Sequence, residues 1–284
     1  MGKLGILTYL YTRVIIFIGL IAILIPLLWI FSLSFRLSSE TFSSYFLLIP
    51  KHITFENYPA ALKYATMYFD IGFPRMYLNS FIITSSSVVL TLFIALLAGF
   101  ALSNFKFRAH TVVYTLVLAC FMIPSQVLLI PLFILFKNIG LLNNYFSVIF
   151  TYTIFTVPIS VLIFRDFFYS IPQSLKEAAI IDGASNFSYF LKVAIPISKP
   201  AIASSIIYTF TLSWNEFLLA MVFLGKNQIK PLPVALANIA GGEFLISYNV
   251  FAATMMLCII PILIVFLLLQ KWFIMGITAG ALKG

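Results

Sequence analysis

Six long apolar stretches constrain the fold of this chain more than any other feature. They cover residues 14–35, 78–102, 112–136, 147–164, 200–224 and 248–270. A helix rises about 1.5 Å per residue, so about 20 apolar residues cross a hydrocarbon core about 30 Å thick. With 62% hydrophobic and 9% charged residues, the chain lacks the polar surface that a soluble domain needs. Backbone groups in lipid must be satisfied within each segment, and these runs do not alternate as barrel strands do. We therefore predict an all-α membrane protein with six transmembrane helices.

The basic residues predict how the chain lies in the membrane. Six spans place both termini on one side. With the N-terminus inside, the inside segments are 1–13, 103–111, 165–199 and 271–284, and they hold ten of the 17 Lys and Arg residues. Because basic residues favour the cytoplasmic side, we expect a multi-pass protein of the plasma or inner membrane with both termini cytoplasmic. The net charge of +9 suits contact with anionic lipid headgroups. The basic residues are dispersed along the chain, which does not favour nucleic-acid binding.

The predicted domains follow from this topology. Residues 1–13 form a cytoplasmic N-terminus, 14–270 the membrane domain and 271–284 a cytoplasmic tail. The membrane domain includes a long extracytoplasmic loop over 36–77 and a cytoplasmic loop over 165–199. Within the first loop, residues 54–62 favour a short helix with Asn57 as its cap.

The cytoplasmic loop 165–199 predicts two short helices. Ser174 and Glu177 have the spacing of a capping box, so a helix is expected over about 175–182. Gly183 suits the end of this helix, where a left-handed backbone conformation is easy only for glycine. Ser185 is expected to cap a second helix that ends at Pro196. In that helix Phe187, Phe190 and Leu191 share one face.

The first of these helices favours a docking surface. Ala178 and Ala179 are small enough for a partner to approach closely, and the acids Glu177 and Asp182 bracket the turn. The alternative is an amphipathic hairpin that lies at the interface and only braces the helices.

The motifs around this loop resemble a known family. Glu177-Ala178-Ala179, then Asp182-Gly183-Ala184 and Ile195-Pro196, resemble the EAA loop of ABC importer permeases. Trp214-Asn215-Glu216-Phe217, Pro231-Leu232-Pro233 and the tail from Lys271 to Gly284 resemble the carbohydrate-uptake, MalG-like branch. The resemblance covers nearly the whole chain and is weakest in the first outside loop.

The resemblance implies a fold, a role and partners. The fold would be that of MetI/MalG-like ABC permeases, with the EAA loop forming a coupling helix in a cleft of a cytoplasmic ATPase. The residues implied to couple to the ATPase are Glu177, Ala178, Ala179, Asp182, Gly183, Ala184 and Pro196. The implied partners are a second, MalF-like permease that completes a heterodimer, an ABC ATPase dimer and an extracytoplasmic solute-binding protein. ATP and Mg would be bound by the ATPase, so this chain would hold no cofactor.

The tail carries Gly276, Gly280 and Gly284 at every fourth position, a spacing that allows close backbone approach. The resemblance implies that this tail reaches the ATPase dimer interface. A flexible end is the alternative.

Catalytic and metal-binding patterns are absent from the sequence. Gly225-Lys226 is followed by Asn227 where a Walker A motif needs Ser or Thr, so we do not expect ATP hydrolysis. His52 and His110 have no plausible metal partners nearby in sequence, and no nucleophile elbow occurs. Cys120 and Cys258 each lie in an apolar run and are interpreted as packing residues. The chain is therefore not expected to be an enzyme.

Glu216 is the only acid within a predicted span. A charge there costs at least about 2.5 kcal/mol unless it faces water or a partner group. We interpret Trp214, Asn215 and Glu216 as candidates for the solute pathway, because sugars stack on aromatic rings and bind amide and carboxylate groups. Gln126 and Asn79 are weaker candidates. The alternative is a structural hydrogen-bond cluster against the partner permease.

Two functions remain at this point. The first is the permease subunit of an ATP-driven importer for an oligosaccharide or a related polyol or glycerol phosphate. The second is a self-contained secondary transporter, which requires an ion or proton site. A single acid in the spans, with no His or Lys partner there, argues against the second.

Overall fold

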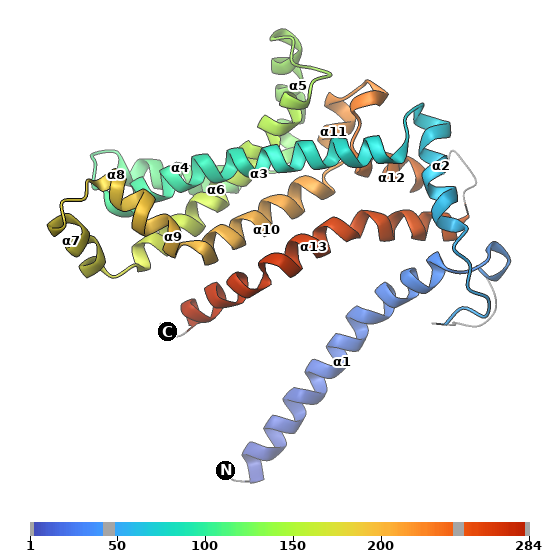
Figure 1. Ribbon diagram of the computed structural model, residues 1–284, viewed down its shortest axis with the longest axis horizontal. Helices are drawn as coiled ribbons and strands as arrows, with labels where there is room; N and C mark the ends of the chain where they lie inside the picture. The colour runs from blue at the N-terminus through green and yellow to red at the C-terminus, as the bar shows by residue number, and fades with distance from the viewer. Residues whose placement is uncertain (1–2, 42–48, 241–246, 282–284) are drawn as a thin grey trace. The chain divides into compact units, whose positions relative to one another are not determined.

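The chain is helical throughout the part that is described (Figure 1). The structure is a computed structural model that describes residues 3–41, 49–240 and 247–281, and its elements are helices over those ranges. In chain order they are α1 (Lys3–Ser34), η1 (Ser38–Glu40), α2 (Asn57–Phe69), α3 (Phe73–Asn104), α4 (His110–Phe121), η2 (Ser125–Leu128), α5 (Leu129–Asn138), α6 (Tyr145–Ser170), α7 (Gln173–Ile181), α8 (Asn186–Tyr189), the π-helical η3 (Phe190–Ala194), α9 (Ile195–Ile197), α10 (Lys199–Asn215), α11 (Leu218–Phe223), η4 (Asn227–Ile229), α12 (Leu232–Ala240) and α13 (Tyr248–Ala281).

Four helices are long and apolar enough to cross a membrane unbroken, namely α1, α3, α6 and α13. Two bent pairs bring the number of candidate spans in the described residues to as many as six. One pair joins α4 to residues 125–138 with a bend of 93°, and the other joins residues 186–197 to α10 with a bend of 73°. The prediction of an all-α membrane protein is confirmed.

Two predicted spans are interrupted. The stretch 112–136 breaks between Phe121 and Ser125, where Pro124 has an extended backbone and donates no hydrogen bond. The stretch 200–224 breaks at Glu216, which has an extended backbone (φ −74°, ψ 125°) and separates α10 from α11. The fifth span is therefore shorter than predicted, and the break places a carboxylate at the start of α11.

The chain divides into two compact units. The first comprises residues 1–73 and 236–259, and two buried asparagines hold the end of α1 within it. The Asn57 amide donates to the carbonyls of Ser34 (2.9 Å) and Arg36 (2.8 Å), and the Asn249 amide donates to those of Arg36 (2.8 Å) and Leu33 (3.3 Å). The two amides thus donate to carbonyls at and just beyond the end of α1, where a helix lacks N–H partners of its own. The prediction that Asn57 caps its own helix is wrong, because Asn57 is the first residue of α2 and its side chain serves α1 instead.

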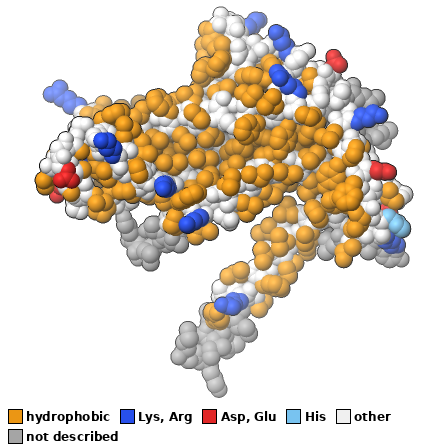
Figure 2. All heavy atoms as spheres, viewed as in Figure 1, with side chains coloured by type: hydrophobic (Ala, Val, Ile, Leu, Met, Phe, Trp, Pro, Cys, Tyr) orange, Lys and Arg blue, Asp and Glu red, His pale blue; other side chains and the backbone are white. Residues whose placement is uncertain are grey.

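The second unit comprises residues 74–235 and 260–284 and contains the candidate sites. Its helices α3, α6 and α10 run side by side (Figure 1). Gly99 on α3 permits close packing, since a Cβ there would lie 2.6 Å from Cβ of Phe164 and 2.9 Å from the backbone nitrogen of Arg165 on α6. Hydrophobic side chains cover most of the flank of this unit (Figure 2), as expected for a surface in contact with lipid.

Candidate functional site

Helix α7 ends as the sequence predicts. Gly183 has φ +82°, its N–H donates to the Ile180 carbonyl at 2.9 Å, and the N–H of Ala184 donates to the Ala179 carbonyl at 2.9 Å. A left-handed residue with two such bonds is the usual way to satisfy the last carbonyls of a helix. Asp182 is the residue just before this turn, and its own N–H donates to the Ala178 carbonyl.

The predicted capping box at the start of α7 is wrong. The helix begins at Gln173 after Pro172, two residues earlier than a cap at Ser174 would allow, so Ser174 already lies inside it. The Glu177 carboxylate accepts from Nε2 of Gln173 at 2.9 Å. This is a bond between neighbours on one helix face, four residues apart.

The second short helix begins as predicted but does not end at Pro196. Ser185 Oγ accepts from the N–H of Ser188 at 3.2 Å, so Ser185 caps α8. The chain then continues through η3 and α9 into α10. Pro196 lies in the first turn of α9, where a proline needs no backbone donor, and Ser198 Oγ donates to the Ala194 carbonyl at 2.6 Å. The loop is thus linked to α10 by short helical segments that end in a bend of 73°.

The helices of this loop differ in exposure, with α7 exposed and the start of η3 buried. No residue of α7 is buried, and Leu175, Ile180 and Ile181 are exposed, Ile181 by 84%. Ala178 is exposed as well, whereas Ala179 packs in part against the buried cluster around Phe190. Of the two small residues, only Ala178 is therefore open to a partner.

Phe190 is the anchor of the segment. It is 4% exposed, and its ring lies 4.7 Å from that of Phe100 on α3 and 6.2 Å from that of Phe168 on α6. Phe187 and Leu191, predicted to share its face, are exposed, and the ring of Phe187 lies 6.3 Å from that of Phe190.

A second contact joins α7 to the membrane helices. Nζ of Lys176 donates to Oδ1 of Asn104, the last residue of α3, at 3.1 Å. A groove of about 630 Å³ runs along this contact and is lined by residues of α3, α6, α7 and α8, including Glu177 and Tyr189. Helix α7 thus lies at one end of the second unit (Figure 1), and its apolar side chains remain exposed.

The tail packs against the start of α10. A Cβ on Gly276 would lie 3.3 Å from Cβ of Pro200, the second residue of α10. Gly280 belongs to α13, and Gly284 lies outside the described residues.

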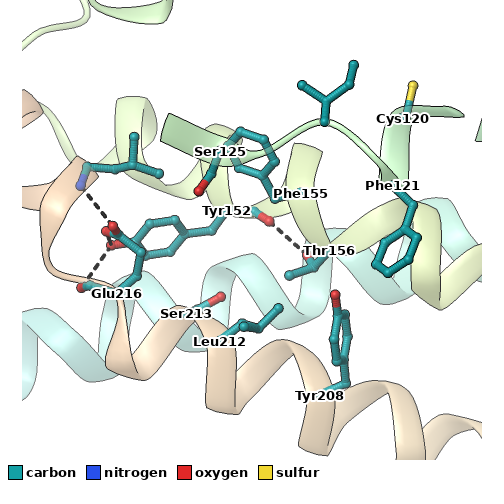
Figure 3. Close-up of a pocket in the computed structure, with 12 residues that line it drawn as sticks. Cys120, Phe121, Ser125, Tyr152, Phe155, Thr156, Tyr208, Leu212, Ser213 and Glu216 are labelled. Atoms are coloured by element: carbon teal, nitrogen blue, oxygen red, sulfur yellow. Dashed lines mark hydrogen bonds between the residues drawn. The ribbon is translucent and has the colours of Figure 1, made fainter. Parts of the chain in front are cut away.

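The acid of the interrupted span faces a cavity (Figure 3). Oε2 of Glu216 accepts from the hydroxyl of Tyr152 at 2.7 Å and from the N–H of Ala220 at 3.2 Å, and Oε1 accepts from the N–H of Leu219 at 2.8 Å. The last two donors belong to the first turn of α11, so the carboxylate caps that helix. The cavity measures about 220 Å³ and also has Ser125, Tyr208 and Ser213 in its lining.

The other residues predicted for the solute pathway are not among the described residues that line this cavity. Trp214 is 2% exposed and stacks on Phe210 at 5.5 Å, so that ring face is already occupied. Asn215 is exposed and donates to the Thr211 carbonyl, and Gln126 is exposed on η2. Asn79 is fully buried, donates to the carbonyls of residues 228 and 230, and accepts from a tyrosine hydroxyl at 2.7 Å.

Sequence reasoning missed the other polar residues of the cavity. Tyr152 and Thr156 lie on α6, Tyr208 and Ser213 on α10, and Ser125 at the break of the third predicted span. The four-residue spacing from Tyr152 to Thr156 marks one helix face, but it does not tell which face turns to a cavity. Tyr152 reaches Glu216 across 64 positions of sequence.

Comparisons with known proteins agree with this architecture. Residues 91–278 match the family described as binding-protein-dependent transport system inner membrane component. The chain is 33% identical to the probable ABC transporter permease protein YurM of Bacillus subtilis, over 95% of this chain and 87% of YurM. It is 33% identical to the trehalose/maltose transport system permease protein MalG of Thermococcus litoralis, over 96% and 97% of the two chains.

A solved structure shares the fold. A chain of a bacterial ABC transporter involved in the import of the acidic polysaccharide alginate superposes with a TM-score of 0.79, is 27% identical and is covered over 99% of its length, against 96% of this chain. The prediction of an ABC permease fold is thereby confirmed, as is the prediction of a subunit without an enzymatic activity of its own. The chain belongs to the family of binding-protein-dependent transport system inner membrane components and is a membrane-spanning permease subunit of an ABC importer.

Proposed function

We propose that this permease subunit carries a carbohydrate, delivered by an extracytoplasmic solute-binding protein, across the plasma or inner membrane. Together with a second permease subunit it forms the translocation pathway, and an ABC ATPase dimer drives transport. The trehalose/maltose name of one relative and the alginate importer of similar fold support the solute class. ATP and Mg belong to the ATPase, and both termini of this chain face the cytoplasm.

One observation carries the coupling role. Helix α7 exposes Leu175, Ile180 and Ile181 on the loop between two candidate spans, and none of its residues is buried. Apolar side chains exposed outside the lipid are expected to be covered by a partner. The exposed acids Glu177 and Asp182 lie on and just after the same helix, and Ala178 leaves room for close approach.

Motion of α7 can reach the pathway through this chain alone. The loop is anchored by Phe190 and by the bond between Lys176 and Asn104, and it continues through η3 and α9 into α10. Helix α10 ends at Glu216. A push on α7 by the closing ATPase dimer reaches the start of α10 across the 73° bend before it, and the cavity around Glu216 lies at the other end of α10. Gly276 against Pro200 ties the tail to the same element, and the tail continues toward the ATPase.

The experiment compares two substitutions that reverse the same charge. Glu177→Lys changes an exposed acid of α7, and Asp166→Lys changes an exposed acid on α6, outside α7. We expect Glu177→Lys, like Gly183→Asp, to abolish ATP-dependent uptake while the protein stays in the membrane, and Asp166→Lys to retain uptake.

Membrane-fraction blots and co-purification of the ATPase accompany the uptake assay. Wild-type uptake by both Glu177→Lys and Gly183→Asp would refute the coupling role. Uptake that persists in vesicles without any ATPase would favour a secondary transporter instead.

A further inference from the structure

The cavity beside Glu216 has a built polar wall. Glu216 is fixed there by three donors, the Tyr152 hydroxyl and two backbone N–H groups, which complement a negative charge. Its carboxylate cannot swing away without leaving the first turn of α11 uncapped. The cavity therefore carries a fixed acid.

Ser213 supplies an unused hydrogen-bonding group in the same cavity. Its side chain is 5% exposed, it belongs to the lining, and its Oγ has no hydrogen-bond partner (Figure 3). Buried polar groups without partners are rare in folded proteins, and a ligand hydroxyl is one group that satisfies them. Tyr208 lies five residues before Ser213 on α10 and adds an aromatic ring with a hydroxyl to the lining of the same cavity.

The lining has charge of one sign only. Its twelve described residues are apolar or hydroxyl-bearing apart from Cys120 and Glu216, and none of them is Lys or Arg. An anion in this cavity lies near the Glu216 carboxylate with no basic residue in the lining to offset the repulsion. Binding sites reject ligands by such repulsion between like charges. A neutral sugar ring meets hydroxyl groups and aromatic faces instead.

We propose that this cavity is a solute subsite that selects uncharged sugar units and rejects anionic ones such as uronates, sulfonates and phosphates. Glu216 provides the repulsion and an acceptor for sugar hydroxyls, Ser213 a buried hydroxyl partner, and Tyr208 a ring surface. At about 220 Å³ the cavity is smaller than the roughly 300–1,000 Å³ of typical ligand sites, so it takes one portion of a longer solute. This inference rests on the proposed pathway role of the chain.

Cys120 provides a native reporter of the potential in the cavity. It is an exposed lining residue, and mass spectrometry separates its peptide from that of Cys258. The intact transporter complex in lipid nanodiscs is reacted with cationic and anionic methanethiosulfonates of similar size, and each rate is divided by that with a free thiol. A unit charge acting over about one Debye length, at an effective dielectric constant near 20, gives a roughly five- to tenfold preference for the cation.

We expect this preference in the wild type and its loss in Glu216→Gln. Ser125→Cys, combined with Cys120→Ser, repeats the measurement at a second lining position. Equal rates for the two reagents, or a preference that survives Glu216→Gln, would overturn the proposal. Absence of labelling at both positions would also overturn it, because a cavity closed to water cannot take a solute.

A matched pair of sugars tests the class of ligand. We expect galactotriose, which is neutral, to slow the reaction of Ser125→Cys with a neutral maleimide, and trigalacturonate to have no effect. Protection by trigalacturonate as strong as that by galactotriose, or protection by neither, contradicts the inference. A complex that labels as expected but imports no sugar would refute the proposed function and leave the charge of the cavity established.

Discussion

Replacing Glu216 by alanine tests how the fifth span is interrupted. The substitution removes the acceptor of the Tyr152 hydroxyl and of two N–H groups in the first turn of α11. A hydrogen bond to a charged group contributes about 1.5–3 kcal/mol, and loss of a helix cap costs about 0.5–2 kcal/mol. Because these effects overlap and water enters the cavity, we expect a loss of about 2–4 kcal/mol in the stability of this junction.

Hydrogen exchange of the complex in nanodiscs reads this junction directly. A local loss of about 2–4 kcal/mol speeds exchange at the Leu219 and Ala220 amides by more than about tenfold, since 1.4 kcal/mol corresponds to a factor of ten. Glu216→Gln keeps one acceptor oxygen and is expected to lie between the wild type and alanine. Asn215→Ala is the control, because Asn215 is exposed and its side chain makes one bond to the Thr211 carbonyl. Wild-type protection in Glu216→Ala would refute the capping role of the carboxylate.

Three further substitutions test the fold and the loop. Gly99→Ala places a Cβ 2.6 Å from Cβ of Phe164, and overpacking of this kind costs about 1–3 kcal/mol, so we expect a lower midpoint temperature of thermal unfolding. Gly19 has open space around it, so Gly19→Ala is expected not to lower this midpoint, and equal midpoints for the two variants would contradict the packing. Asn249→Leu removes the amide donor to carbonyls at the end of α1 and is expected to cost about 1–3 kcal/mol, measured as faster proteolysis; an unchanged cleavage rate would contradict the role of this side chain. Gly183→Ala places a Cβ on a residue at φ +82°, which costs about 1–2 kcal/mol. We expect lower uptake at unchanged abundance in the membrane, and full uptake would show that transport does not need the left-handed turn at residue 183.

Local chemistry made part of the loop predictable. Gly183 ends α7 and Ser185 caps α8 because these roles depend on a few neighbouring residues. The start of α7 was not predictable from the capping-box pattern, because Pro172 allows the helix to begin at Gln173 and so places Ser174 inside it. Ala178 is exposed and Ala179 is partly buried because Ala179 packs against the cluster that contains Phe190 of η3, and no pattern within α7 reveals this contact.

The cavity depends on contacts between distant parts of the chain. An apolar run through 200–224 predicts one span, and its interruption at Glu216 requires the Tyr152 hydroxyl from α6 and the donors of α11. The acid itself was identifiable, because a charge in an apolar run needs a reason. Trp214 was a candidate by residue type and Asn79 a weaker one, but in the structure the Trp214 ring packs on Phe210, and the Asn79 amide donates to the carbonyls of residues 228 and 230.

Site-specific photo-cross-linking tests the central claim, that α7 is the surface gripped by the ATPase. A benzophenone amino acid replaces Ile181, which is 84% exposed on the last turn of α7, or Met122, which is 80% exposed at the bend after α4. In the intact complex we expect an ATPase adduct from position 181 and none from position 122. A complex that retains its ATPase but gives no adduct from position 181 would contradict the account.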